Sequence, residues 1–254
     1  MNDLVGTANG TLIDPGNIAT FSGGMLNLPN GGANSNQATF TTGAYVALPA
    51  GTISSLGSQA TFETWINMNA NRNWAEIWSF GTSDAGQGMA TGAPNSRYIT
   101  LIPQNGANQK LRLTHRSVGG PGDPAENFVD GTAALSTGTE HQLVTVWNQT
   151  DATDGANGTQ YLYLDGALVG HSAIRAGISL ATIQDVNNWL GRSQWPDPLI
   201  DAKYDDFRIF NTALSAQDVM TDFGAGPNVV PEPGSLLVVG FGASCLLAAR
   251  RRRV

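Results

Sequence analysis

The chain has 254 residues, which is enough for one large β domain or two small ones. Only 13% of the residues are charged and two are lysines, while 31 are glycines, so the composition disfavours a helical bundle. Residues 1–230 hold nine basic and nineteen acidic side chains, a net charge of −10, which excludes a basic nucleic-acid-binding face.

The first six residues contain neither a basic segment nor an apolar run, so they do not form a signal peptide. Either the protein is cytoplasmic or its true start lies upstream, and the C-terminal segment described below favours export. The single cysteine, Cys245, lies in the last apolar run. The body therefore has no disulfide, thiolate metal site or cysteine nucleophile.

Short runs of alternating apolar residues recur through the body, with Gly, Asn, Asp and Pro between them. This period of two is typical of strands, and about a dozen strands without a long helix predict a β-sandwich. Trp65 and Trp147 fall inside such runs, and we expect both in the core. The predicted strands are Thr39–Leu48, Ala60–Met68, Glu76–Phe80, Tyr98–Ile102, Lys110–His115, Gln142–Trp147, Gln160–Leu164, Ala167–Gly170, Asn188–Gly191 and Ala202–Phe210.

Two local signals are sharper than the rest. Asp165 and Gly166 fit the two positive-φ positions of a type I′ hairpin turn. Ser215 is a predicted N-cap, with Asp218 in the first turn of a short helix. We therefore predict a domain over residues 1–223, a linker over 224–230 and a separate tail over 231–254.

The order of the body segments resembles the laminin-G-like, concanavalin A-like jelly-roll family over about residues 4–222. The resemblance implies an all-β jelly-roll sandwich but no single function, because this fold hosts binders, enzymes and structural modules. The segments that carry it are Asn9–Leu12, Tyr45–Pro49, Ala60–Ile66, His141–Trp147, Tyr161–Gly170, Leu190–Gly191 and, most specifically, Asp205–Ser215.

The C-terminus combines a Pro-Glu-Pro tripeptide, an uncharged apolar run over Ser235–Ala249 and a terminal arginine cluster. As a helix, the apolar run reaches roughly 22 Å, which approaches the hydrocarbon core of about 30 Å when its flanks are included. The arginines would stay cytoplasmic, which places the body on the other side of the membrane. The alternative is a buried C-terminal helix.

This tail resembles the PEP-CTERM sorting signal of Gram-negative bacteria. The resemblance implies export across the inner membrane, recognition and removal of the tail by an exosortase-type protease, and a final location at the cell surface or outside the cell. The residues of the sorting signal are Pro231, Glu232, Pro233, Arg250, Arg251, Arg252 and Arg253.

Catalytic patterns are missing from the sequence. Glycoside hydrolases on this fold place two or three carboxylates on one strand, but Glu63 and Glu76 stand alone on separate strands. His115, His141 and His171 are isolated, and we expect His141 to be a half-buried packing residue. No Ser/His/Asp set has suggestive spacing, so the sequence predicts a non-catalytic module.

A structural calcium ion is one interpretation of two aspartates. Asp3 near the start and Asp206 in the last strand would share one Ca²⁺ if the first and last strands are neighbours. The alternative is that Asp206 only accepts hydrogen bonds from backbone N–H groups. We expect no other cofactor.

Aromatic side chains in two polar loops predict a ligand site. Trp195 lies in a proline-containing loop with Arg192 and Asp197, and Trp74 lies in another polar loop. Sugar rings stack on such aromatics while polar groups supply hydrogen bonds. The alternative is that these rings only plug the ends of the sandwich.

Together these patterns predict an exported, non-catalytic jelly-roll module that binds a polysaccharide or the extracellular matrix at the cell surface. Its partners would be an exosortase-type protease, the inner membrane through the tail and a carbohydrate ligand, with no nucleic acid. A purely structural surface or biofilm protein and a divergent glycan-active enzyme remain the alternatives.

Overall fold

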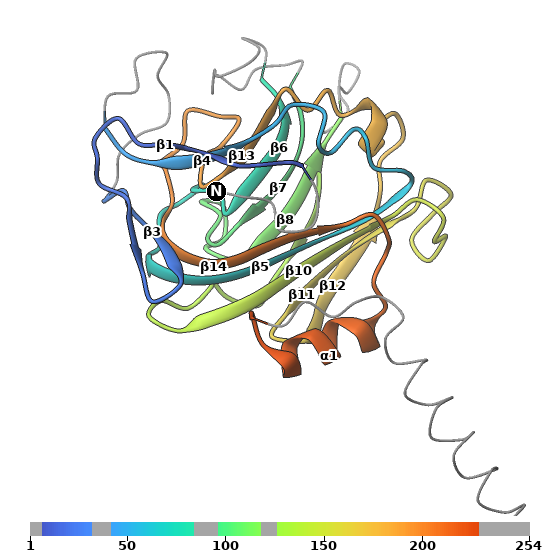
Figure 1. The fold of residues 1–254 in the computed structure, drawn as a ribbon. Helices are drawn as coiled ribbons and strands as arrows, with labels where there is room; N and C mark the ends of the chain where they lie inside the picture. Colours follow the sequence, from blue (N-terminus) through green and yellow to red (C-terminus); the bar gives the residue numbers. More distant parts are fainter. Residues whose placement is uncertain (1–6, 32–41, 84–95, 118–125, 229–254) are drawn as a thin grey trace, which may run out of the picture.

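The computed structural model describes residues 7–31, 42–83, 96–117 and 126–228. These residues form two antiparallel sheets packed face to face, with helix α1 on the outside of one of them (Figure 1). The predicted all-β sandwich is therefore confirmed. Asp3 and the whole predicted tail, residues 231–254, lie outside the described residues. Within the described ranges, no helix is long and apolar enough to cross a membrane.

We call the two sheets A and B. In spatial order, sheet A contains β1 (Thr11–Ile13), β4 (Tyr45–Leu48), β13 (Asn187–Leu190), β6 (Trp78–Thr82), β7 (Arg97–Ile102), β8 (Arg112–Arg116) and β9 (Glu126–Asp130). Sheet B contains β12 (Ala167–Ala173), β11 (Thr159–Leu164), β10 (Glu140–Asn148), β5 (Gln59–Ala70), β14 (Asp201–Phe210), β3 (Met25–Pro29) and β2 (Thr20–Ser22). The helical elements are η1 (Leu180–Thr182) and α1 (Ala216–Ala225).

The alternation seen in the sequence sets which face of each strand is buried in the core. In β5, Phe62, Ile66 and Met68 are at most 1% exposed and belong to the main core cluster between the sheets. Trp147 of β10 belongs to the same cluster, as predicted. Trp65 is also buried, but it is outside that cluster and stacks on Phe223 of α1, with 6.0 Å between ring centroids.

Helix α1 explains why the outer face of sheet B is also buried. Ser215 and Asp218 form the predicted N-terminal cap, a reciprocal capping box. Val219 then packs against Val144, Val146 and Tyr163 on the side of sheet B that faces away from the main core. The helix runs to Ala225, two residues into the segment predicted as a linker.

The predicted hairpin turn between β11 and β12 is confirmed. Asp165 and Gly166 both have positive φ, at 51° and 76°, which the type I′ turn requires. A Cβ atom on Gly166 would lie 3.1 Å from the side chain of Phe223. Glycine at this position therefore serves both the turn and the close approach of α1.

Candidate functional site

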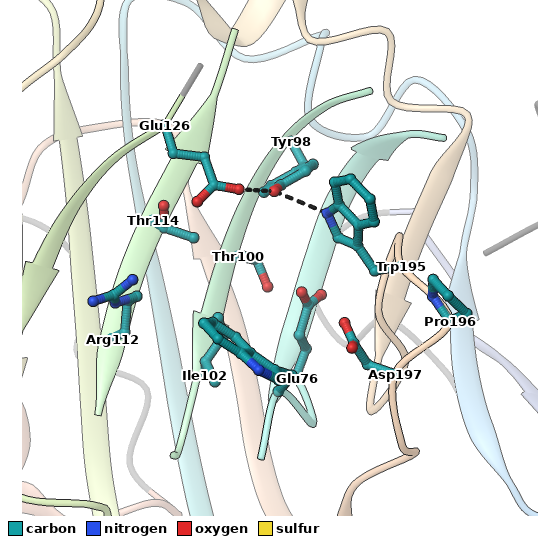
Figure 2. Close-up of a pocket in the computed structure, with 11 residues that line it drawn as sticks. Glu76, Tyr98, Thr100, Ile102, Arg112, Thr114, Glu126, Trp195, Pro196 and Asp197 are labelled. Carbon is teal, nitrogen blue, oxygen red and sulfur yellow. Dashed lines mark hydrogen bonds between the residues drawn. The ribbon is translucent and has the colours of Figure 1, made fainter. Parts of the chain in front are cut away.

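A cavity of about 310 Å³ opens on the outer face of sheet A (Figure 2). Helix α1 packs on the outer face of sheet B, which is the opposite side of the sandwich. The alternation of β7 creates its floor, because Ile99 and Leu101 enter the core while the residues between them face outward. The pocket is lined by Trp74, Glu76, Tyr98, Thr100, Ile102, Arg112, Thr114, Glu126, Trp195, Pro196 and Asp197.

The loop between β13 and β14 forms one wall of this pocket. The indole Nε1 of Trp195 donates a hydrogen bond to the hydroxyl of Tyr98 at 2.9 Å, and that hydroxyl in turn donates to the carboxylate of Glu126 (Figure 2). Ser193 donates to Asp197 at 2.9 Å and accepts from the backbone N–H of Trp195 at 3.0 Å. These contacts hold the loop against sheet A.

Trp74 enters the pocket from the loop before β6. Its backbone is in the left-handed region, with φ at 67°, and its N–H donates to the carbonyl of Gln104 at 3.0 Å. A Cβ atom on Gly106 would lie only 2.2 Å from the indole nitrogen of Trp74. The ring therefore rests directly on a glycine, which leaves it half-buried and held in place.

Glu76 is the buried carboxyl of the pocket. It is 2% exposed, and its Oε2 has no hydrogen-bond partner within the described part of the chain. Burial, and then the negative charge of Asp197, raise the pKa of Glu76 to about 8, although nearby hydroxyls including that of Thr100 partly offset the rise. Glu76 therefore keeps its proton at neutral pH.

Asp197 lies beside Glu76 (Figure 2). Burial raises the pKa of Asp197 to about 6, and the hydrogen bond from Ser193 opposes the rise. At pH 7 the pocket thus holds one neutral and one ionised carboxyl group next to each other. Paired carboxyls of this kind can orient sugar hydroxyls or act as an acid and a base.

Arg112 is the one cationic side chain among the described lining residues. Its Nε and Nη2 donate to the two carboxylate oxygens of Asp130 at 2.6 and 2.8 Å. Its guanidinium carbon also lies 3.7 Å from the centroid of the Phe128 ring. Two of its five N–H donors are therefore used in a bidentate pair within the sheet.

Three of the four predicted ligand-binding residues lie in this pocket: Trp74, Trp195 and Asp197. Arg192 does not line it. That side chain is 2% exposed, and its guanidinium carbon lies 4.8 and 4.2 Å from the ring centroids of Tyr45 and Trp189. It also donates to the Tyr45 hydroxyl at 2.9 Å, so it supports the base of the loop.

The sequence interpretation did not include four pocket residues: Glu76, Tyr98, Arg112 and Glu126. Glu76 was noticed only as a lone acid. The other three lie on strands, and only the pairing of β7 with β8 and of β8 with β9 brings them together. A charged or tyrosine residue at an outward position of a strand was the available signal, but many strands have one.

The described residues give the calcium hypothesis no support, and it stays a prediction. Asp206 forms an ion pair with Arg208 at 2.6 Å, and β14 is paired with β3 and β5, whereas β1 belongs to the other sheet. No three His, Cys, Asp or Glu side chains in the described ranges lie close enough together to hold a metal ion. Asp3 itself is outside these ranges.

His141 looked isolated in the sequence, but the fold brings it into contact with an aspartate and a serine, a set that no spacing in the sequence indicated. His141 Nδ1 lies 2.8 Å from Asp165 Oδ2, and its Nε2 lies 2.6 Å from Ser136 Oγ. Asp165 also accepts the N–H of Gln142 at 3.0 Å, because the hairpin turn folds back onto the start of β10.

This Ser/His/Asp set has a structural use, since it ties the β11–β12 turn to β10. A hydrolytic triad also needs backbone donors for an oxyanion. The N–H of Gly138, two residues from Ser136, is already bonded to the carbonyl of Met68 at 2.9 Å. We therefore assign the set to holding the hairpin.

Comparison with known proteins identifies the class of this fold. Residues 40–220 match the family model described as the Concanavalin A-like lectin/glucanases superfamily, and residues 229–253 match the PEP-CTERM protein-sorting motif. The chain belongs to the Concanavalin A-like lectin/glucanases superfamily, and its sorting motif indicates export and surface sorting in a Gram-negative bacterium. Both resemblances seen in the sequence are thereby confirmed.

Solved structures of low sequence identity share the fold. One is domain 4 of AbnA, an extracellular GH43 arabinanase from Geobacillus stearothermophilus, in complex with arabinotriose (TM-score 0.59, 16% identity, 87% of this chain and 91% of that chain). Another is the CBM40 of Ruminococcus gnavus IT-sialidase bound to α2,3-sialyllactose (TM-score 0.51, 11% identity, 83% and 97%). No curated protein matches the chain in sequence.

Proposed function

We propose that this exported module binds carbohydrate in the pocket on sheet A and has no catalytic activity. The observation that carries the proposal is the position of Trp74 and Trp195, which line one cavity from two loops far apart in sequence. Indole faces stack on the C–H faces of sugar rings. The carboxyls of Glu76 and Asp197 supply the few directed polar groups that fix a ligand's orientation.

Two further observations favour a glycan ligand. The cavity, at about 310 Å³, falls at the lower end of the range of roughly 300–1,000 Å³ found for small-molecule sites. In addition, two structures that share the fold contain a bound oligosaccharide, arabinotriose in one and sialyllactose in the other. A sugar ligand in this chain is thus consistent with both the size and the chemistry of its pocket.

The PEP-CTERM motif supports the second half of the proposal. An exosortase-type protease would recognise the tail in the inner membrane and remove it, which leaves the module at the cell surface or outside the cell. Pro231 and Pro233 favour an extended segment that a protease cleft can hold, because proline fixes φ and disfavours helix in the residue before it.

A glycan array probed with the full chain in detergent tests the binding function. We expect binding that quenches tryptophan fluorescence, and we expect Trp74→Ala and Trp195→Ala each to weaken it. Phe21→Ala is the matched control, because Phe21 is 64% exposed on the edge strand β2 of the other sheet. Absence of binding to every glycan would favour the purely structural surface protein.

One specific observation favours a second function, that of a glycan-active enzyme. Glu76 and Asp197 form a carboxyl pair with pKa values of about 8 and about 6, and such a difference suits a general acid and a general base. This function predicts release of reducing sugar from a bound glycan. It also predicts that Glu76→Gln abolishes this release while binding persists.

A further inference from the structure

The charges that line the pocket are unbalanced. Three carboxyl groups face it, those of Glu126, Asp197 and Glu76, the last of which is neutral at pH 7, against the single guanidinium of Arg112 among the described lining residues. Arg112 is already paired with both carboxylate oxygens of Asp130. The pocket therefore carries an excess of acidic groups at its surface.

A second guanidinium lies near the rim and is also engaged. The guanidinium carbon of Arg116 lies 5.6 Å from the centroid of the Trp195 ring, and its Nη1 donates to the carbonyl of Ser96 at 3.0 Å. Recognition of a carboxylate ligand uses a guanidinium that presents two parallel N–H donors to it. Arg112 presents its paired Nε and Nη2 donors to Asp130, and Arg116 directs Nη1 to a backbone carbonyl, so these donors are not offered to a ligand.

Glu76 gives the pocket a hydrogen-bond donor instead. Its side chain is buried, its Oε2 lacks a protein partner within the described residues, and its carboxyl points into the cavity beside Asp197 (Figure 2). A protonated carboxyl donates one hydrogen bond, and the natural acceptor in a sugar is a hydroxyl, ring or glycosidic oxygen. The ionised Asp197 accepts hydrogen bonds from sugar hydroxyl groups.

From this arrangement we infer that the pocket selects uncharged sugars and excludes sugars that carry a carboxylate, such as uronic acids. The inference rests on the proposed carbohydrate-binding function. A ligand carboxylate would replace a hydroxyl donor with a negative charge next to Asp197 and Glu126. Juxtaposed like charges at a binding interface weaken binding, so we expect the uronate to bind at least about tenfold more weakly than the neutral sugar.

The test is an array of matched sugars that differ only at C6. Glucose- and galactose-terminated oligosaccharides are compared with the corresponding glucuronate- and galacturonate-terminated ones, and with the methyl esters of those uronates. We expect the full chain to bind at least one neutral sugar at least about tenfold more tightly than its uronate. The methyl ester, which keeps the bulk without the charge, should recover binding.

Variants locate the source of the discrimination. Glu126→Gln combined with Asp197→Asn should reduce the difference in affinity between the neutral sugar and the uronate, because both changes replace a carboxyl by an amide of nearly the same shape. Glu140→Gln is the matched control, since it removes a carboxyl from β10 of sheet B, and it should leave the difference unchanged.

The failures of the two proposals are distinguishable. Equal or tighter binding of uronates overturns the charge selection and leaves the carbohydrate-binding function intact. A discrimination that survives in the Glu126→Gln/Asp197→Asn variant also overturns it. Binding to no sugar on the array overturns the binding function and this inference together.

Discussion

The indole N–H of Trp195 and the hydroxyl of Tyr98 are joined by a 2.9 Å hydrogen bond across 97 residues of chain. Because the same hydroxyl donates to Glu126 on the next strand but one, a single phenol oxygen connects the loop after β13 to β7 and β9. The orientation of the Trp195 ring therefore depends on a residue of the sheet.

Tyr98→Phe tests this dependence. The substitution keeps the ring but removes the acceptor for Trp195 and the donor for Glu126, so both half-buried partners lose a hydrogen bond. We expect the free energy of unfolding to fall by about 1–3 kcal/mol and glycan affinity to fall with it. Chemical denaturation and fluorescence titration measure the two effects, and an unchanged affinity would show that the loop holds Trp195 without this bond.

Glu76→Gln tests the burial of the neutral carboxyl. In the unfolded chain the pKa of Glu76 is near 4.5, and in the folded protein it is about 8, so the folded state keeps a proton that the unfolded state has lost. Its contribution to stability is present below pH 4.5 and is lost as the pH rises to about 8, by on the order of 5 kcal/mol.

The Gln variant has no such proton. We therefore expect it to become more stable relative to the native sequence as the pH rises from 4.5 to 8, with the difference measured by urea denaturation at several pH values. The stability difference between the two proteins at pH 4.5 is the reference value, because both side chains are neutral in the folded state at that pH. A difference that is independent of pH would contradict the assigned protonation of Glu76.

We expect the folded protein to lose stability in acid because His115 is buried in its neutral form. Burial, followed by the nearby charge of Arg175, lowers the pKa of His115 to about 4, and the neighbouring Gln160 side chain partly opposes this. Its Nε2 accepts the backbone N–H of Arg175 at 3.0 Å, which requires the neutral ring. Stability that is fully present above pH 6.5 should be lost as the pH falls towards 4, by on the order of 3 kcal/mol.

The His115→Gln variant should lose less stability than the native chain as the pH falls from 7 to 4. At pH 7 the variant is less stable than the native chain. Melting temperatures between pH 4 and pH 7 measure the slope. His171→Gln is the control, since His171 is exposed and bound to Asp154 on the hairpin side of sheet B. Parallel curves for His115→Gln and the native chain would count against the depressed pKa.

Trp65→Ala should cost roughly 3–5 kcal/mol of unfolding free energy, as expected for a buried tryptophan. Part of this cost belongs to the stacking on Phe223, which is worth about 0.5–1.5 kcal/mol for a typical aromatic pair. A double-mutant cycle with Phe223→Ala isolates that part. A loss below about 1 kcal/mol for Trp65→Ala alone would mean that helix α1 does not cover this face in solution.

The sorting tail predicts a specific mature end. In the native host, the protein should end near Pro231 and lack the arginine cluster, and replacement of Arg250–Arg253 by Ser should leave processing incomplete. Mass spectrometry of the surface-released protein measures this. Intact peptides that cover Leu236–Ala249 would instead indicate a permanent anchor or a core helix.

The period of two in the sequence predicted ten strands that the structure contains, because burial of one face imposes alternation over each of them. The strands that were not predicted lie at sheet edges or beside them. β2 has only three residues, all exposed, β3 ends in a proline, and β9 carries an acid at each end. β2 has no buried residue, and β3 has only two, Leu26 and Leu28, in five residues, so the alternation that reveals a strand is absent or very short.

For the site, too, the sequence predicted what depends on neighbouring residues and missed what depends on contacts between distant segments. Trp195 and Trp74 were predicted because each lies in a polar loop, which is a local property. The role of Glu76 depends on Asp197, which is far away in sequence and reaches it only through the path of a loop over the sheet. The pairing of His141 with Asp165 likewise depends on the register between β10 and β11, which the sequence pattern does not specify.

The chain leaves the fold on the side of the sandwich that carries α1, and this sets the position of the pocket relative to the C-terminal segment. Arg208 of β14 donates a hydrogen bond to the carbonyl of Pro227, so the chain leaves the fold beside sheet B, whereas the pocket opens on sheet A. Whatever holds the chain beyond Asn228 is therefore attached at the back of the molecule. The pocket points away from that attachment, so an attachment at this end leaves the pocket open to a ligand.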